Sequence, residues 1–172
     1  MPYLALFVVT NKREYSTVNR GIEFIEDNKY EEALESVNNA LDIKLGFKKF
    51  FVRSTINSTR IRIKAQVLYY LKKYDESIEY ADEAIKSSKT NYKAWRIKGL
   101  ASGQLGNYKE AIKCHDKILG KYPDAAETLN NKGYALAKIK NMIKILKCID
   151  KALKLIPEMS IYWIVRDLSW KN

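Results

Sequence analysis

Apolar residues recur along this chain at spacings of three and four, the period of a helix with one buried face. In the stretch 92–125, two such patterns flank a turn at Gly106-Asn107, and Pro123 closes the stretch because proline cannot continue a helix. Shifting the sequence by 34 residues in either direction brings similar residue types into register. We therefore predict a repeat whose unit is two antiparallel helices joined by a turn.

The repeat accounts for most of the chain. We predict four units in a single domain over 14–172, and these units are 14–47, 58–91, 92–125 and 126–159. A last helix over 160–170 is expected to cap the open end of the stack. Residues 48–57 fall outside the period, so they either extend the preceding helix or loop out. Gly46 favours a break, and Ser54-Thr55 favours a turn before the next helix.

The first ten residues form an apolar run. The run lacks the basic leader and cleavage site of a signal peptide, and it is far shorter than the roughly 20 residues that span a bilayer. We expect 1–13 to dock on the first repeat. Two cysteines without a CxxC spacing fit a reducing compartment, so the expected location is the cytoplasm, with no membrane partner.

Composition and charge narrow the functional classes. With 47% hydrophobic and 30% charged residues, but only 7 Gly and 3 Pro, the chain is too apolar for disorder and too poor in turn residues for a many-stranded β fold. The net charge is +11. Eight basic and eight acidic residues cancel in 1–57, so 58–172 carries the whole excess. This asymmetry suggests an acidic partner, although lysine on solvated helix faces is the simpler explanation.

We find no catalytic constellation, metal site or cofactor motif in the sequence. The single histidine, His115, lies on the buried side of a predicted helix, where a packing role is expected. Cys114 and Cys148 have no second histidine or CxxC pair with which to bind zinc. Glycine-rich phosphate loops are absent as well. The expected function is therefore non-catalytic.

Several residues of 92–125 resemble the tetratricopeptide repeat, a 34-residue helix–turn–helix unit. Trp95, Gly99, Tyr108, Ala111 and Pro123 match its pattern. Two positions depart from it, since Lys98 and His115 stand where leucine and an aromatic residue are usual. The resemblance implies an all-α fold, a right-handed α-solenoid of antiparallel helix pairs. It also implies a protein–protein interaction scaffold.

In this family the first helix of each repeat lines a concave groove that holds a partner peptide. Carried over to this chain, the groove mixes tyrosines with cations, and arginine recognises carboxylates in bidentate fashion. The resemblance therefore implies a partner protein or peptide with an acidic segment. The groove positions are Arg62, Gln66, Tyr69, Tyr70, Lys93, Arg96, Leu100, Gln104, Asn130, Tyr134 and Lys138.

Some family members hold the acidic C-terminus of heat-shock chaperones with lysines, asparagines and an arginine. When 58–91 is taken as the first unit, the corresponding positions hold Arg62, Gln66, Ile97, Glu127 and Asn131. When 92–125 is taken as the first unit, they hold Arg96, Leu100, Asn131, Ile161 and Val165. Neither set forms this clamp, so we do not expect that binding mode.

A basic outer ridge is the second candidate surface. Four of its lysines are spaced 3, 4 and 3 apart on one helix face, and two more lie 34 residues before members of that group. The ridge consists of Lys113, Lys117, Lys144, Lys147, Lys151 and Lys154. The equivalent positions one unit earlier are Glu79 and Glu83. Three alternatives stay open: a nucleic-acid-binding surface, a homo-oligomeric assembly module, or charge that only keeps the protein in solution.

Overall fold

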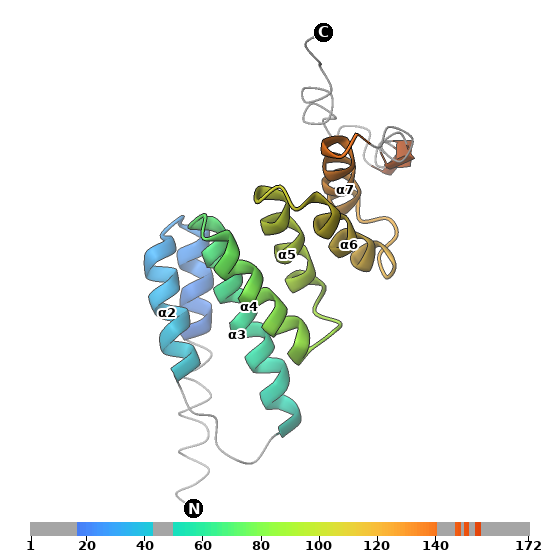
Figure 1. Cartoon of the computed structure of the whole chain (residues 1–172). Helices are drawn as coiled ribbons and strands as arrows, with labels where there is room; N and C mark the ends of the chain where they lie inside the picture. Colours follow the sequence, from blue (N-terminus) through green and yellow to red (C-terminus); the bar gives the residue numbers. More distant parts are fainter. Residues whose placement is uncertain (1–16, 43–49, 141–146, 149, 152–153, 156–172) are drawn as a thin grey trace, which may run out of the picture. The chain divides into compact units, whose positions relative to one another are not determined.

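The computed structural model describes residues 17–42, 50–140, 147–148, 150–151 and 154–155 (Figure 1). Every regular element in these residues is a helix. A helical segment over 17–26 comes first and is followed by α2 (Tyr30–Asp42), α3 (Phe50–Tyr70), α4 (Tyr74–Ser87), α5 (Tyr92–Gln104), α6 (Tyr108–Leu119) and α7 (Ala126–Lys138). The expected docking segment 1–13, the capping helix 160–170 and Lys144 lie outside the described residues.

The predicted turn at Ser54-Thr55 is wrong. Both residues are helical, because α3 begins at Phe50 and runs for 21 residues. Residues 50–57 therefore extend the following helix, which neither sequence alternative anticipated. The physical reason is that 50–70 contains no glycine or proline. The serine and threonine favour turns but disfavour a helix interior only weakly.

The turns between paired helices share one backbone conformation. Asn28, Lys72, Gly106 and Lys140 have φ of 59°, 60°, 78° and 60°, and the last three are spaced by 34 residues. The N–H of the next residue donates to a carbonyl five residues earlier, as in Lys73 to Leu68 (2.9 Å) and Asn107 to Ser102 (2.8 Å). This pattern is the Schellman motif, which satisfies carbonyls that a helix end leaves unpaired. The turn predicted at Gly106-Asn107 is confirmed.

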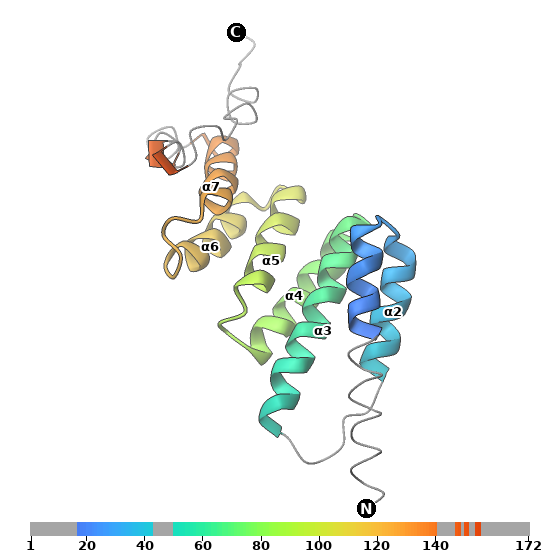
Figure 2. The same ribbon diagram turned by 180° about the vertical axis from the view of Figure 1, so that it is seen from behind.

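The chain forms two compact units, 1–94 and 95–172, which we describe separately. In the first unit, α2 packs on α3 through the buried cluster Ala33, Val37, Ile63 and Val67. The segment 17–26 runs beside α2 in both views (Figures 1 and 2). Gly21 allows this close approach, because a Cβ there would lie 3.0 Å from the Val37 side chain.

Buried hydroxyl groups join α4 to α3 within the first unit. Ser77 Oγ donates to the carbonyl of Ala65 at 2.7 Å, and Ser58 Oγ donates to the carbonyl of Ala84 at 3.0 Å. Asn91 then donates to Ser58 Oγ at 2.9 Å. Its own side-chain oxygen accepts the N–H of Ala94, as a helix N-cap does. These neutral hydrogen bonds fix where α5 begins.

The second unit is built from α5, α6 and α7. The buried residues of α6 are Ala111, Cys114, His115 and Ile118, and α7 adds the buried leucines Leu129 and Leu136. Gly99 of α5 lies against α6, since a Cβ there would be 2.9 Å from His115 Cε1 and 3.1 Å from Cys114 Cβ. Within the described residues, no helix has the length and apolar character needed to cross a bilayer.

Candidate functional site

Charge is unevenly distributed over the four helices α2 to α5. The first helices α3 and α5 contain seven Lys or Arg residues and no carboxylate. The second helices α2 and α4 contain nine carboxylates and a single lysine, Lys86. The helices α3 and α5, on which eight of the eleven predicted groove positions lie, are thus cationic, and cationic residues attract acidic ligands.

In the first unit, four predicted groove residues lie along α3 at helical spacing. Arg62 Nη1 donates to Gln66 Oε1 at 3.2 Å. Tyr70, 39% exposed, stacks on Tyr30 of α2 with ring centroids 5.0 Å apart, and Tyr69 contacts both Tyr70 and Tyr74 at 5.7 Å. The structure thus brings four tyrosines together next to a guanidinium–amide pair.

In the second unit, the central cation of the predicted groove has an acidic partner. Arg96 Nη1 donates to Glu127 Oε1 at 2.8 Å, from α5 to the first turn of α7. Because both side chains are more than a third exposed, this pair contributes little to stability, at most about 1 kcal/mol. A ligand carboxylate could therefore replace Glu127 on Arg96 at small cost.

The remaining groove positions are accessible as well. Tyr134 packs edge-on to Tyr108 at 6.5 Å, and Lys138 Nζ lies 5.1 Å from the Tyr134 ring centroid. Leu100 and Asn130 are half-buried, whereas Lys93, Gln104 and Lys138 are exposed. None of the eleven predicted positions is buried, as residues that contact a partner require.

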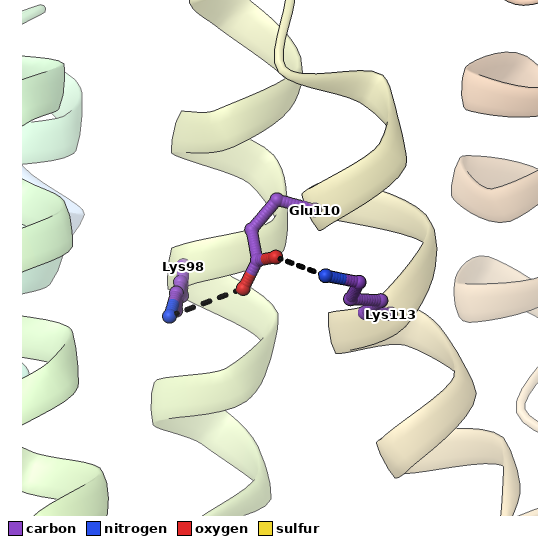
Figure 3. A network of polar contacts seen from close by, with 3 residues as sticks. All are labelled: Lys98, Glu110 and Lys113. Carbon is purple, nitrogen blue, oxygen red and sulfur yellow. Dashed lines mark hydrogen bonds and ion pairs between the residues drawn. The ribbon is translucent and has the colours of Figure 1, made fainter.

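A second set of charged residues joins α5 to α6. Figure 3 shows Glu110 between two lysines, with Lys98 Nζ 3.3 Å from Oε1 and Lys113 Nζ 3.3 Å from Oε2. Partial burial raises the pKa of Glu110, but hydrogen bonds from Lys113 and Lys98 and their charges outweigh it. The pKa of Glu110 therefore lies below its ordinary value, and the carboxylate stays ionised at neutral pH.

Sequence reasoning missed that Lys98 belongs to a periodic set. Arg20, Lys64, Lys98 and Lys132 occupy the same position of the four repeats. Lys64 Nζ lies 4.3 Å from the Tyr80 ring centroid, and Lys132 Nζ lies 2.6 Å from Asp116 Oδ1. The 34-residue spacing was visible in the sequence, but the partners differ in type and distance along the chain. Lys64, Lys98 and Lys132 are partly buried and pair their charged ends with residues of the second helices. Arg20 is exposed and lies over Phe24 of its own segment.

The outer ridge is partly neutralised. Lys113 pairs with Glu110, Lys151 with Asp124 at 3.1 Å, and Lys154 with Asp150 at 2.8 Å. Lys117 and Lys147 are exposed and form no ion pair with any described residue. The ridge therefore has fewer available cations than its sequence suggested.

His115 and the two cysteines lie in the core of the second unit. His115 is 2% exposed, its Nδ1 has no hydrogen-bond partner among the described residues, and burial lowers its pKa to about 4. Cys114 and Cys148 are free and buried, and burial raises the pKa of the Cys148 thiol. In the described part of the chain, no three His, Cys, Asp or Glu residues are placed to hold a metal ion.

Comparison with known families identifies the repeat. Two family models, both described as tetratricopeptide repeat, match residues 64–126 and 126–159. Together they span more than half of the chain. The chain belongs to the tetratricopeptide repeat family. The second matched range is the same as the fourth unit read from the sequence. A search among curated protein sequences returned no match.

Solved structures show the same fold. MamA (residues 41–end) from Desulfovibrio magneticus RS-1 is 18% identical with a TM-score of 0.72, over 88% of this chain and 79% of that one. YrrB, a tetratricopeptide repeat protein "with an unusual peptide-binding site", is 19% identical with a TM-score of 0.72, covering 89% and 74%. The first such domain of Spaghetti (RPAP3), bound to the HSP90 peptide SRMEEVD, is 19% identical with a TM-score of 0.66, covering 75% and 94%. The all-α, helical-repeat solenoid fold class is confirmed.

Proposed function

We propose that this protein is a non-catalytic interaction scaffold whose first helices bind an acidic segment of a partner protein. The observation that carries the proposal is the charge of α3 and α5, which contain seven cations and no carboxylate. Arg62, Lys93 and Arg96 are the cations at groove positions, and none of them is buried. Arg60 is buried, and Lys64 and Lys98 contact residues of the second helices, so these three are not counted as groove charge. A family fold specifies only where a partner can lie, whereas side-chain charge selects what binds there.

The partner chemistry follows from the side chains on the first helices. Arg62 and Arg96 would bind carboxylates through paired N–H donors. Tyr70 and Tyr134 offer large, rigid contact surfaces for aliphatic or aromatic anchors. An acidic peptide that also carries apolar residues satisfies both features. The buried free cysteines suit a cytoplasmic location, and no cofactor is needed for this role.

Fluorescence anisotropy tests the proposal with labelled 12-residue peptides. One peptide set contains Asp and Glu with interspersed Leu and Phe, and the matched set has Asn and Gln in place of the acids. We expect the acidic set to bind at least about tenfold more tightly, because each charge-assisted hydrogen bond contributes about 1.5–3 kcal/mol. The combined change Arg62→Glu with Arg96→Glu should remove this difference.

A matched control is Lys86→Glu with Lys121→Glu. It changes the net charge by the same amount but uses exposed lysines outside the first helices. It should leave peptide affinity within about twofold. Glu127→Gln should raise affinity, since it removes the carboxylate that already occupies Arg96. Equal losses from the control and the groove variant would show that only net charge matters, and the proposal would then be wrong.

A further inference from the structure

Oppositely charged residues occupy the same three positions of consecutive repeats. Asp75, Glu79 and Glu83 follow one face of α4 at intervals of four residues. Adding 34 to each number gives the lysines of α6, and these are Lys109, Lys113 and Lys117. All six side chains are exposed. The two helices thus present stripes of equal length, equal spacing and opposite sign.

The three carboxylates of the α4 stripe are not neutralised within the described structure. Asp75, Glu79 and Glu83 form no ion pair with a described residue. Like charges four residues apart destabilise a helix by about 0.2–0.5 kcal/mol for each pair. The α4 stripe therefore carries a repulsion that a cationic surface of matching spacing would relieve.

The lysines of α6 are also in excess over their partners. Lys109 and Lys117 form no ion pair with a described residue, and Lys113 shares its acceptor, Glu110, with Lys98. This stripe lies on a second helix, so it is separate from the first-helix positions of the proposed groove. A role of the α6 stripe is therefore independent of peptide binding in the groove.

We infer that the protein associates head-to-tail with a second copy of itself, the α4 carboxylates of one copy facing the α6 lysines of the next. Each stripe spans nine residues, about 12 Å of helix from first to last, so three ion pairs can form in one register. A polyanion such as nucleic acid would engage only the lysines and leave the α4 carboxylates unsatisfied. A second copy satisfies both stripes at once.

This contact has two physical consequences. Each two-copy complex keeps one unused stripe of either sign, so the association can continue beyond two copies, into a closed ring or an open chain. Exposed ion pairs contribute only about 0.2–1 kcal/mol each and are screened by salt. Three such pairs contribute at most about 3 kcal/mol, so the association should be weak, in the millimolar range, and it should disappear at about 0.5 M salt.

Sedimentation velocity on the full chain tests the inference with a pair of variants. One variant is Glu79→Lys with Glu83→Lys, and the other is Lys113→Glu with Lys117→Glu. At about 0.1 M salt, wild type should form concentration-dependent oligomers, and each variant alone should be monomeric. An equimolar mixture should associate again, because the α6 lysines of one variant face the α4 carboxylates of the other, and the two reversed stripes also have opposite charges. Circular dichroism verifies that both variants fold.

Glu23→Lys with Glu26→Lys is the control, since it makes the same charge change on exposed residues outside both stripes. It should oligomerise as wild type does. Wild type that stays monomeric at about 1 mM would overturn the inference, as would a mixture that stays monomeric. If wild type and both variants are monomeric and the variants melt at a lower temperature, the two stripes interact within one chain, and the inference is wrong. A 20-nucleotide probe that binds wild type but not the Lys113→Glu, Lys117→Glu variant, in the absence of self-association, would show that the lysines bind a polyanion. That result would also contradict the inference.

Discussion

The helix pair α3–α4 in the first unit and the pair α5–α6 in the second unit follow one repeat pattern but are joined by different chemistry. Ser77 and Ser58 join the first pair through buried, neutral hydrogen bonds of 2.7 and 3.0 Å. The second pair has Ala111 where the first has Ser77, and it relies on a glycine contact with His115 and on the Lys98–Glu110 ion pair. Nothing in the 34-residue period requires either solution.

The repeat therefore specifies the spacing of the contact positions but not the type of interaction at each position. Neutral hydroxyl–carbonyl bonds do not titrate, so the α3–α4 pair should be insensitive to pH. A buried imidazole and a carboxylate–lysine pair both titrate, so the α5–α6 pair should weaken in acid. Four predictions test this contrast and its limits, and they are ordered by expected size.

Acidification should produce the largest effect, and it should act on the second unit. Because the pKa of His115 falls from 6.5 to about 4 on folding, the unfolded state binds the proton more readily. His115 therefore contributes stability that is complete above pH 6.5 and is lost as pH falls toward 4, by about 3 kcal/mol. Urea denaturation followed by tryptophan fluorescence measures this, since all three tryptophans lie in 95–172.

The change His115→Phe isolates that contribution. Phenylalanine has no ring nitrogen to protonate or to leave unpaired, and an aromatic residue is usual at this position of the repeat. The variant should lose less stability than wild type between pH 7 and pH 4. The same pH dependence in both proteins would mean that His115 is not the acid-sensitive group.

Gly99→Ala should have the next largest effect, a destabilisation of about 1–3 kcal/mol, because the added Cβ would meet His115 and Cys114 at 2.9 and 3.1 Å. Gly103 in the same helix is the matched control, since no atom lies within 4 Å of its Cβ position. Gly103→Ala should stabilise the protein by up to about 1 kcal/mol through helix propensity. Thermal melts that shift both variants in the same direction would contradict the close packing of α5 on α6.

Ser77→Ala should destabilise the first unit by about 1 kcal/mol, because it deletes a buried hydrogen bond while the Ala65 carbonyl keeps its place in the helix. The loss should be equal at pH 7 and pH 4.5, unlike that of the second unit. Amide hydrogen exchange in α3 and α4 reports it locally. A loss that grows in acid would remove the contrast between the two units.

Lys72→Gly and Lys140→Gly should each stabilise by about 0.5–1 kcal/mol. Both residues hold a positive φ that costs an L-residue about 1–2 kcal/mol, and the greater chain entropy of unfolded glycine offsets part of the gain. Gly106→Ala should be destabilising for the same reason. Chemical denaturation midpoints resolve these changes, and a midpoint lowered by Lys72→Gly would contradict the turn geometry.

Much of the fold was readable from the sequence because its signals are local and repeated. The turn at Gly106 follows from residue chemistry, whereas Lys72 and Lys140 adopt the same conformation only by their place in the period. The start of α3 at Phe50 could not be read from the sequence. Serine and threonine are compatible with a helix or a turn, and packing decides between them.

The site was readable only in part. Helical spacing found the residues of α3 that lie together, such as Arg62 and Gln66. The Arg96–Glu127 pair joins residues 31 apart, and its formation depends on how α5 and α7 approach each other. The pairing of Lys98 with Glu110 likewise depends on interhelix distance. Charge on a single helix is a property of the sequence, but ion pairing between helices is a property of the packing.

Binding of an acidic peptide to the cationic helices α3 and α5 can be tested most directly by nuclear magnetic resonance. Titration of the isotope-labelled protein with an acidic, leucine-containing 12-residue peptide reports which backbone amides change their environment. We expect chemical-shift changes at the α3 amides near Arg62–Tyr70 and at the α5 amides near Arg96, and none at the exposed positions of α4 and α6. Shifts concentrated instead around Lys113 and Lys117 would contradict it.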